Sequence, residues 1–217
     1  MDITTHISFQ KINVKLFVEK FSNHFGLNPL NYNPDGFWYS CNNEWEKNMA
    51  VINNKLFKYK VLTNKLKILK IRNLKELDEF TRIFKNHNAS NIANIINWDY
   101  VYKTYDGLEM CPFLGSKMKY SKLFRYITVV MSNDDKELIN KLLFKKTNEN
   151  LNKILDKMTL ETNIEGYEIS KKFFRNEMTK LCKDNNKYIY RLWCFGWEIS
   201  SGVIWKNYKN LILQQFV

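Results

Sequence analysis

The chain has 217 residues and a mass of 26.2 kDa, with 45% hydrophobic and 26% charged residues. These values are typical of one globular domain that folds without a disulfide or metal. Only 7 Gly and 3 Pro are present, which excludes collagen-like and linker-like sequences. No apolar run is long enough for a membrane span, and the N-terminus lacks a signal-peptide pattern, so we expect a soluble, intracellular protein.

The formal net charge is +12, with 34 basic and 22 acidic residues. Such an excess favours a polyanionic partner, nucleic acid above all. Only five of the basic residues are Arg, although the forked guanidinium is preferred for phosphate recognition. Lys, Asn and Ile are also the residues of A/T-rich codons. The charge is therefore either functional or a consequence of codon bias, and the sequence leaves both open.

The cysteine and histidine spacing gives no sign of a metal site. No C-x-x-C pair and no H-x-x-x-H pair occurs. We therefore predict that no metal is bound, and that the cysteines are free thiols, as is usual for intracellular proteins. They are Cys41, Cys111, Cys182 and Cys194.

The first third of the chain predicts strands separated by a helix and a loop. Residues 3–9 are rich in β-branched side chains, which indicates a first strand. Asn13 can cap a helix that follows it, and residues 28–36 carry the Pro, Asn and Gly of a loop. An aromatic strand over 37–41 comes next, and 65–71 alternates basic and apolar residues, as a half-exposed strand does.

Helical periodicity begins after this alternation. Asn73 is a predicted N-cap for a helix over 74–84, and a second helix is predicted over 91–105. Residues 108–111 and 125–131 have the composition of strands.

The second half of the chain predicts helices and then an aromatic, β-rich end. Helices are expected over 134–155 and 167–182, followed by strands within 187–205. The order of elements is mixed, which favours an α+β fold over a doubly wound sheet. We predict a single domain over 1–217: a split β-sheet with flanking helices and a helical-hairpin insertion at 134–184.

Three segments stand out as candidates for function. They are Pro34–Ser40, Tyr105–Pro112 and Trp193–Trp205, whereas phosphate-binding glycine loops and the G-x-S-x-G nucleophile motif are absent. Glu109 interrupts an apolar strand, and a buried carboxylate is costly without a partner. Strand alternation would turn its neighbours inward and Glu109 outward, so it lies either on an exposed pleat or in a functional site.

The three segments resemble a family of short uncharacterised proteins of phages and large DNA viruses. The shared patterns are P-x-G-[LF]-W-x-S, then W-x-x-V-x-x-x-Y-x-G-[IL]-E-[IM]-x-P, then W-x-x-G-W-[DE]-x-x-S-G-x-I-W. Here they cover Pro34–Ser40, Trp98–Pro112 and Trp193–Trp205, about a fifth of the chain. The resemblance implies a viral origin and names no activity.

A more distant resemblance is to ADP-ribosyltransferases, which carry three separated motifs on a split sheet. The motifs are a His or Arg on the first strand, an aromatic-hydroxyl segment on a later strand, and a Glu near the end of the sheet. His6, Tyr39 with Ser40, and Glu109 occur here in that order. The resemblance implies that Glu109 is the catalytic carboxylate and that the other three residues bind NAD, without a metal.

Two classes compete with this enzyme hypothesis. The first is a non-catalytic module that binds nucleic acid or a protein partner, with Trp197 and Arg191 as candidate contacts. The second is a virion or assembly protein. The tryptophans at 193, 197 and 205 are expected to be mostly buried, with Ser200–Gly202 as an exposed turn.

Overall fold

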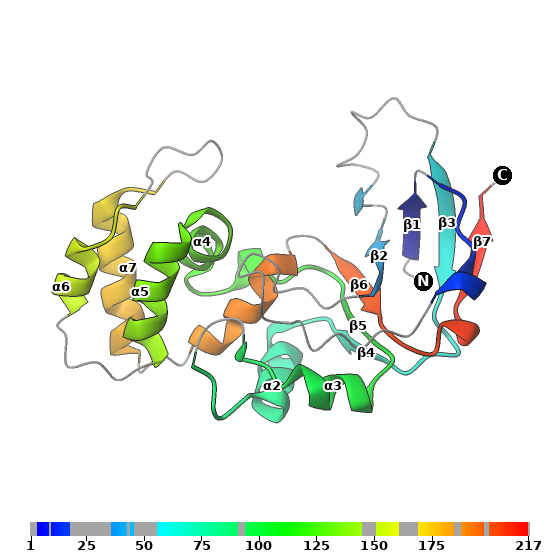
Figure 1. The fold of residues 1–217 in the computed structure, drawn as a ribbon, viewed down its shortest axis with the longest axis horizontal. Helices are drawn as coiled ribbons and strands as arrows, with labels where there is room; N and C mark the ends of the chain where they lie inside the picture. Colours follow the sequence, from blue (N-terminus) through cyan, green and yellow to red (C-terminus); the bar gives the residue numbers. More distant parts are fainter. Residues whose placement is uncertain are drawn as a thin grey trace.

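The computed structural model describes residues 4–8, 10–17, 36–42, 44–45, 56–90, 94–144, 151–160, 169–184, 188–197 and 200–216. Its strands form one open, seven-stranded sheet in the order β4–β5–β6–β2–β1–β3–β7 (Figure 1). The strands are β1 Thr4–Ser8, β2 Phe37–Cys41, β3 Phe57–Leu62, β4 Ile68–Ile71, β5 Gly107–Met110, β6 Ser201–Ile204 and β7 Ile212–Gln215. Only β4 and β5 are parallel; the other neighbours are antiparallel. The predicted α+β class is confirmed.

Helices join these strands, and those between residues 121 and 183 lie at the far end from β7 (Figure 1). The α-helices are α2 Leu74–Phe84, α3 Trp98–Thr104, α4 Ser121–Arg125, α5 Asn133–Phe144, α6 Leu151–Asp156 and α7 Lys171–Lys183. A π-helical turn covers Tyr126–Val130, and 3-10 helices cover Val14–Leu16, Gly115–Lys117, Ile189–Trp197 and Tyr208–Asn210. In the described part of the chain, no helix combines the length and apolarity needed to cross a bilayer.

Helix α2 begins where the sequence predicted. The Asn73 side chain accepts a hydrogen bond from the Glu76 backbone N–H at 2.9 Å. The Glu76 carboxylate reaches back to the Arg72 N–H at 2.7 Å. The first bond satisfies a backbone donor that the first turn leaves without an intrahelical partner, and the second holds the residue that precedes the cap.

Several predicted elements are corrected by the structure. The segment 125–131 is helical rather than a strand, because its buried residues follow the helical spacing set by Leu123 and Phe124. Most of the described part of 187–205 is a 3-10 helix, and only the last residues form β6. The helix predicted over 91–105 begins at Trp98; residues 91–93 lie outside the described residues. Strands β3 and β7 were not predicted.

The helix predicted after Asn13 is a short 3-10 turn at Val14–Leu16, capped by the Asn13 side chain. The rest of that prediction, and the loop predicted over 28–36 apart from Gly36, fall outside the described residues.

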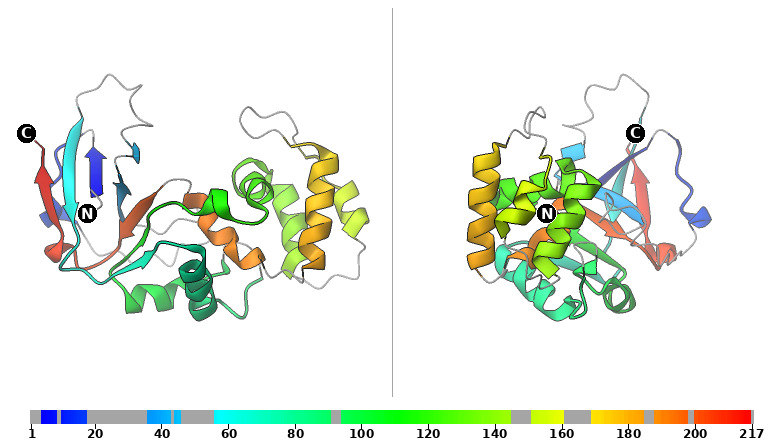
Figure 2. Two further views of the ribbon diagram at one scale, coloured as in Figure 1. Left: turned by 180° about the vertical axis from the view of Figure 1, so that it is seen from behind. Right: turned by 60° about the vertical axis from the view of Figure 1, so that its left-hand side comes forward.

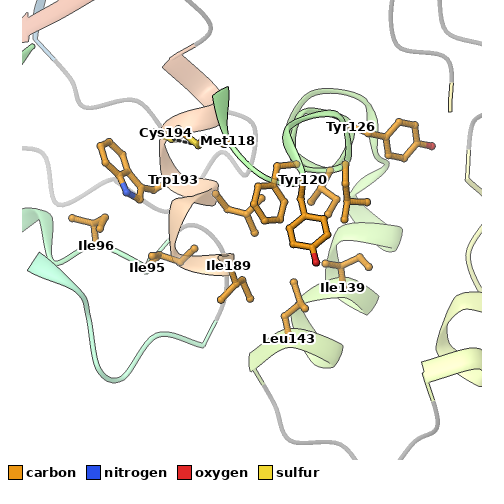
Figure 3. Close-up of a cluster of buried hydrophobic side chains, with 14 of the residues drawn as sticks. Ile95, Ile96, Met118, Tyr120, Tyr126, Ile139, Leu143, Ile189, Trp193 and Cys194 are labelled. Carbon is orange, nitrogen blue, oxygen red and sulfur yellow. Dashed lines mark hydrogen bonds between the residues drawn. The ribbon is translucent and has the colours of Figure 1, made fainter. Parts of the chain in front are cut away.

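One large hydrophobic core joins the sheet to the helices. It contains Leu108 of β5 and Val203 of β6 together with Ile139 of α5 and Phe174 of α7. Figure 3 shows part of it, where Ile139 and Leu143 of α5 lie near Tyr120 and Ile189. Helices α5, α6 and α7 lie side by side in both directions of view (Figures 1 and 2). The separate insertion at 134–184 stays a prediction, since this core is continuous across its boundary.

Two of the three tryptophans near the C-terminus are buried, as predicted. Trp193 is 2% exposed and donates its indole N–H to Thr81 at 3.2 Å. Trp205 is 3% exposed and donates to the Tyr105 carbonyl at 2.7 Å. Both indoles therefore lie in the core with their single polar group satisfied. The side chain of Trp197 lies outside the described residues.

The opposite face of the sheet carries a second, smaller core. Its buried members are Phe37, Tyr39, Val61, Ile204, Tyr208 and Leu211. The sheet is thus covered on both faces, and side chains that alternate away from the main core are buried as well.

Candidate active site

Polar side chains form one row across the sheet. The strand register places Tyr39 on β2 opposite Gly202 on β6, and Gly202 opposite Glu109 on β5. Glu109 is in turn opposite Lys70 on β4. Because directly opposed residues point to the same face of a sheet, Tyr39, Glu109 and Lys70 share one face.

The same row continues on the other side of Tyr39. Thr5 pairs with Ser40, so the register places His6 opposite Tyr39. His6 also pairs with Tyr59 on β3. The row therefore holds His6, Tyr39 and Glu109 in order, with about 14 Å, three strand spacings, between the backbones of His6 and Glu109.

Glu109 is buried between two partners. The Tyr39 hydroxyl donates to Glu109 Oε2 at 2.9 Å, and Lys70 Nζ lies 3.2 Å from Oε1. The Glu109 side chain is 8% exposed and the Lys70 side chain 39%, so solvent reaches this pair from the lysine. Leu108 and Met110 do turn toward the main core, as predicted. The exposed-pleat alternative for Glu109 is nevertheless wrong, because the face it occupies is also covered.

Gly202 makes the contact between Tyr39 and Glu109 possible. The Tyr39 ring crosses β6 directly above Gly202: a Cβ added there would lie 2.3 Å from Tyr39 Cζ and 2.5 Å from its hydroxyl oxygen. Real Cβ atoms do not approach other atoms that closely. Only glycine, which has no Cβ, leaves room for the Tyr39 ring to cross the strand at this position.

Burial and the neighbouring carboxylate raise the pKa of the Tyr39 hydroxyl well above its ordinary value. Burial makes the largest contribution, followed by the charge of Glu109 and the hydrogen bond to it. Tyr39 therefore remains a neutral donor to Glu109 over the whole physiological pH range.

This shift predicts a loss of stability at alkaline pH. A tyrosine whose pKa is higher in the folded state stabilises the fold fully below the unfolded pKa of about 10, and progressively less above it. We expect Tyr39→Phe to lower the free energy of unfolding by about 1.5–3 kcal/mol at pH 7, the usual effect of a hydrogen bond to a charged group. The difference between wild type and variant should shrink above about pH 10, at up to ~1.4 kcal/mol per pH unit.

Urea unfolding at several pH values measures this difference. Tyr100→Phe, on an exposed ring, is the matched control and should behave like wild type throughout. A difference that stays constant up to pH 11 would contradict the role given to the Tyr39–Glu109 hydrogen bond.

His6 is held by the backbone of the neighbouring strand. Its Nδ1 donates to the Trp38 carbonyl at 2.6 Å, and its ring lies 4.5 Å from Phe37 and 5.7 Å from Trp45. Burial lowers the His6 pKa and outweighs the opposing effect of the carbonyl. The neutral ring therefore has an accepting Nε2, which has no hydrogen-bond partner among the described residues.

Ser40 is not part of this row. It alternates with Tyr39 along β2 and points to the opposite face, where its hydroxyl lies 3.0 Å from that of Thr5. Both residues are fully buried. Of the residues predicted to bind NAD, the fold brings His6 and Tyr39 to the face of Glu109, whereas Ser40 lies on the other.

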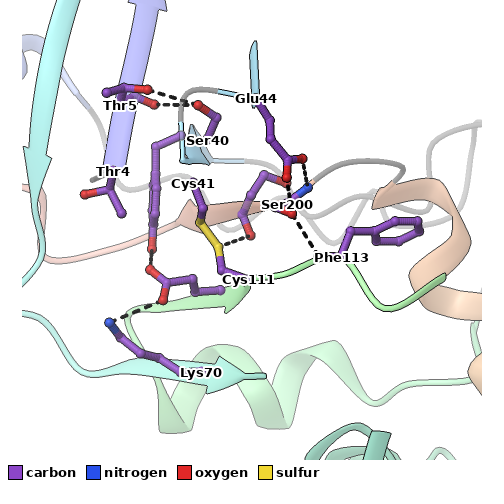
Figure 4. Close-up of a disulfide and its surroundings, with 12 residues drawn as sticks. Thr4, Thr5, Ser40, Cys41, Glu44, Lys70, Cys111, Phe113 and Ser200 are labelled. Carbon is purple, nitrogen blue, oxygen red and sulfur yellow. Dashed lines mark hydrogen bonds and ion pairs between the residues drawn. A yellow bond between two sulfur atoms is a disulfide. The ribbon is translucent and has the colours of Figure 1, made fainter. Parts of the chain in front are cut away.

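Two cysteines lie beside Glu109. Cys41, two residues after Tyr39, and Cys111, two residues after Glu109, form a disulfide with 6.2 Å between their Cα atoms (Figure 4). The free-thiol prediction is wrong for this pair and confirmed for Cys182 and Cys194. The Cys41, Glu109 and Cys111 ligand atoms all lie within 4.8 Å of one another.

The start of β6 is fixed close to this disulfide. The Glu44 carboxylate accepts hydrogen bonds from the Ser200 N–H at 2.9 Å and from its hydroxyl at 2.7 Å (Figure 4). Ser200 and Ser201 are only 2% and 1% exposed. The exposed turn predicted at Ser200–Gly202 is therefore wrong: Glu44 satisfies the Ser200 polar groups, and strand pairing begins at Ser201.

Arg191 has an internal partner. Its Nε and Nη2 donate to the two carboxylate oxygens of Asp78 at 2.7 Å each, and the guanidinium lies 5.0 Å from the Tyr188 ring. This forked pair ties the 189–197 helix to α2. A role for Arg191 or Trp197 in binding a partner stays a prediction.

Sequence reasoning missed Lys70, Gly202 and the cysteine pair. The sequence does contain an indication of the cysteine pair. Cys41 comes two residues after Tyr39, and Cys111 comes two residues after Glu109. Because strand side chains alternate, any fold that joins Tyr39 to Glu109 also brings the two cysteines to one face. Lys70 was seen only as one member of an alternating strand.

Comparison of the chain with models of protein families, with curated proteins and with solved structures found no match.

Proposed function

We propose that the protein is an NAD-dependent ADP-ribosyltransferase with Glu109 as its catalytic carboxylate. The observation that carries this proposal is the cross-strand row, in which His6, Tyr39 and Glu109 occupy one face and Tyr39 donates to Glu109 at 2.9 Å. The order of these residues is the order of the three motifs that the resemblance implies.

The chemistry requires a fixed negative charge. NAD supplies a glycosidic bond whose cleavage leaves positive charge on the ribose, and a carboxylate aimed at that charge lowers the barrier. Tyr39 and Lys70 hold the two Glu109 oxygens in place, so little reorganisation is needed during the reaction.

His6 suits the binding of a ribose hydroxyl. Its Nδ1–H is bonded to Trp38, which leaves the neutral Nε2 to accept a hydrogen bond from the sugar. The half-buried ring of Trp45 beside it offers a flat apolar surface for stacking. Both features match the nucleotide part of NAD.

Glu109→Gln tests the assignment. The amide keeps the size of the side chain and can still accept from Tyr39, so folding should be preserved while the negative charge is lost. We expect the release of labelled nicotinamide from NAD to fall by about 10²–10³-fold in kcat, with NAD binding little changed. Glu137→Gln, on the exposed side of α5, is the matched control. A wild-type protein that releases no nicotinamide with any protein or nucleic-acid mixture, or a variant with full activity, would overturn the proposal.

A further inference from the structure

We propose that Cys41, Glu109 and Cys111, when the disulfide is reduced, form a binding site for a thiophilic divalent cation of the Zn²⁺ class. The three ligand atoms lie within 4.8 Å of one another, and all three residues are buried. This site goes beyond the proposed transferase and requires no NAD.

The donor set suits zinc. Two thiolates and a carboxylate oxygen bind Zn²⁺ at about 2.3 Å and 2.0–2.2 Å, leaving a fourth tetrahedral position for a further ligand. Tetrahedral coordination separates the two sulfur atoms by about 3.8 Å, so they need only rotate apart after reduction. The two Cα atoms, 6.2 Å apart, already bring both side chains to the same point.

Conversion of the disulfide form into the metal-binding form requires two electrons and two protons. A dithiol reductant breaks the S–S bond, gives two electrons and two protons to the sulfur atoms, and becomes a disulfide itself. Metal binding then releases the two thiol protons, because thiolates are the ligands. The disulfide and the metal therefore exclude each other, and reducing compartments favour the metal-binding form.

Charge compensation supports a dication. Two thiolates and the Glu109 carboxylate carry three negative charges, which a dication and the Lys70 ammonium neutralise together. In the oxidised form, the Lys70 ammonium compensates the Glu109 carboxylate. Neither form leaves a buried charge without a counter-charge, which would be costly.

Tyr39 completes the site as a supporting hydrogen-bond donor. Its hydroxyl holds Glu109 Oε2, and each carboxylate oxygen has a further lone pair for a metal. Such outer-sphere donors orient a ligating group, and their loss typically weakens metal affinity by about 10–100-fold.

Co²⁺ is a suitable probe because tetrahedral thiolate ligation gives visible and near-ultraviolet absorption bands. Full-length protein reduced with a non-chelating phosphine should bind one Co²⁺ with a thiolate-to-metal charge-transfer band, and Zn²⁺ should displace it. Oxidised protein should give no band. Tyr39→Phe should weaken Co²⁺ binding by about tenfold or more.

Cys41→Ser should abolish the charge-transfer band or shift and weaken it, whereas Cys182→Ser, at a free cysteine outside the cluster, should leave it unchanged. Because the comparison of reduced and oxidised wild type needs no variant, misfolding of Cys41→Ser cannot obscure the answer. Failure of the reduced protein to bind Co²⁺, equal binding by the oxidised protein, or loss of the band in Cys182→Ser would each overturn the proposal. None of these results depends on nicotinamide release, so this proposal and the transferase can fail separately.

Discussion

Reduction of the Cys41–Cys111 disulfide should lower the free energy of unfolding by about 4 kcal/mol in the absence of metal. The two cysteines are separated by 70 residues, and closing so long a loop restricts the unfolded chain strongly. In the folded protein the bond joins β2 to the end of β5, the two strands on either side of β6. The expected loss is a large part of the stability of an ordinary domain.

Urea unfolding with and without reductant, in the presence of a chelator, measures this loss as a shift in midpoint. A Cys41→Ala, Cys111→Ala double variant is the control, since reductant should not change its midpoint. An identical midpoint for oxidised and reduced wild type would contradict the prediction. In a separate measurement without chelator, Zn²⁺ added to the reduced protein should restore part of the lost stability, because a ligand that binds only the folded state stabilises it.

The elements that the sequence predicted correctly have local causes. β2 is dense in aromatic β-formers, and α2 has both an amphipathic stripe and an Asn73 cap that the structure shows in use. Strong local patterns of this kind decide an element before tertiary contacts form. The prediction of an α+β class followed from their order alone.

The wrong elements depend on tertiary contacts. The β-branched residues at 127–130 favour a strand, yet burial of Leu123 and Phe124 continues the helical spacing of α4 through them. Strand β3 has Lys60 at an exposed position, and β7 has Gln214 and Gln215 at exposed positions. Among the described strands, β3 pairs with β1 and β7, and β7 pairs with β3. Such strands give weak local signals, because their stability comes from pairing.

The sequence allowed us to predict that the candidate residues lie on strands, but not how those strands align them. His6, Tyr39 and Glu109 were expected on strands, and they are. Their alignment follows from the register of four neighbouring strands, which no local pattern gives. Ser40 shows the opposite case: alternation next to Tyr39 already places it on the other face, so its assignment beside Tyr39 could have been rejected from the sequence.

The row of Tyr39, Glu109 and Lys70 also depends on the absence of a side chain at Gly202. A substitution at Gly202 should therefore have a large effect on stability. We expect Gly202→Ala to lower the free energy of unfolding by about 3–5 kcal/mol, from forced overpacking and from the lost hydrogen bond to a charged group. The added methyl would lie 2.3 Å from Tyr39 Cζ, and the ring is fully buried among the side chains of the second core. Glu109 would lose its tyrosine donor, so the same variant should also lose nicotinamide release.

A double-mutant cycle separates this cause from a general intolerance of β6. In a Tyr39→Val background the ring is absent, and Gly202→Ala should then be within about 1 kcal/mol of neutral, since Ala is favoured over Gly in a strand interior. Urea unfolding of the four proteins gives the coupling energy between the two positions. If the two substitutions are additive, the Tyr39 ring is not what requires a glycine on β6. A strong coupling energy between positions 39 and 202 would instead show why Tyr39 of β2 can reach Glu109 of β5. It can do so because Gly202, on the strand between them, has no side chain to block the tyrosine ring.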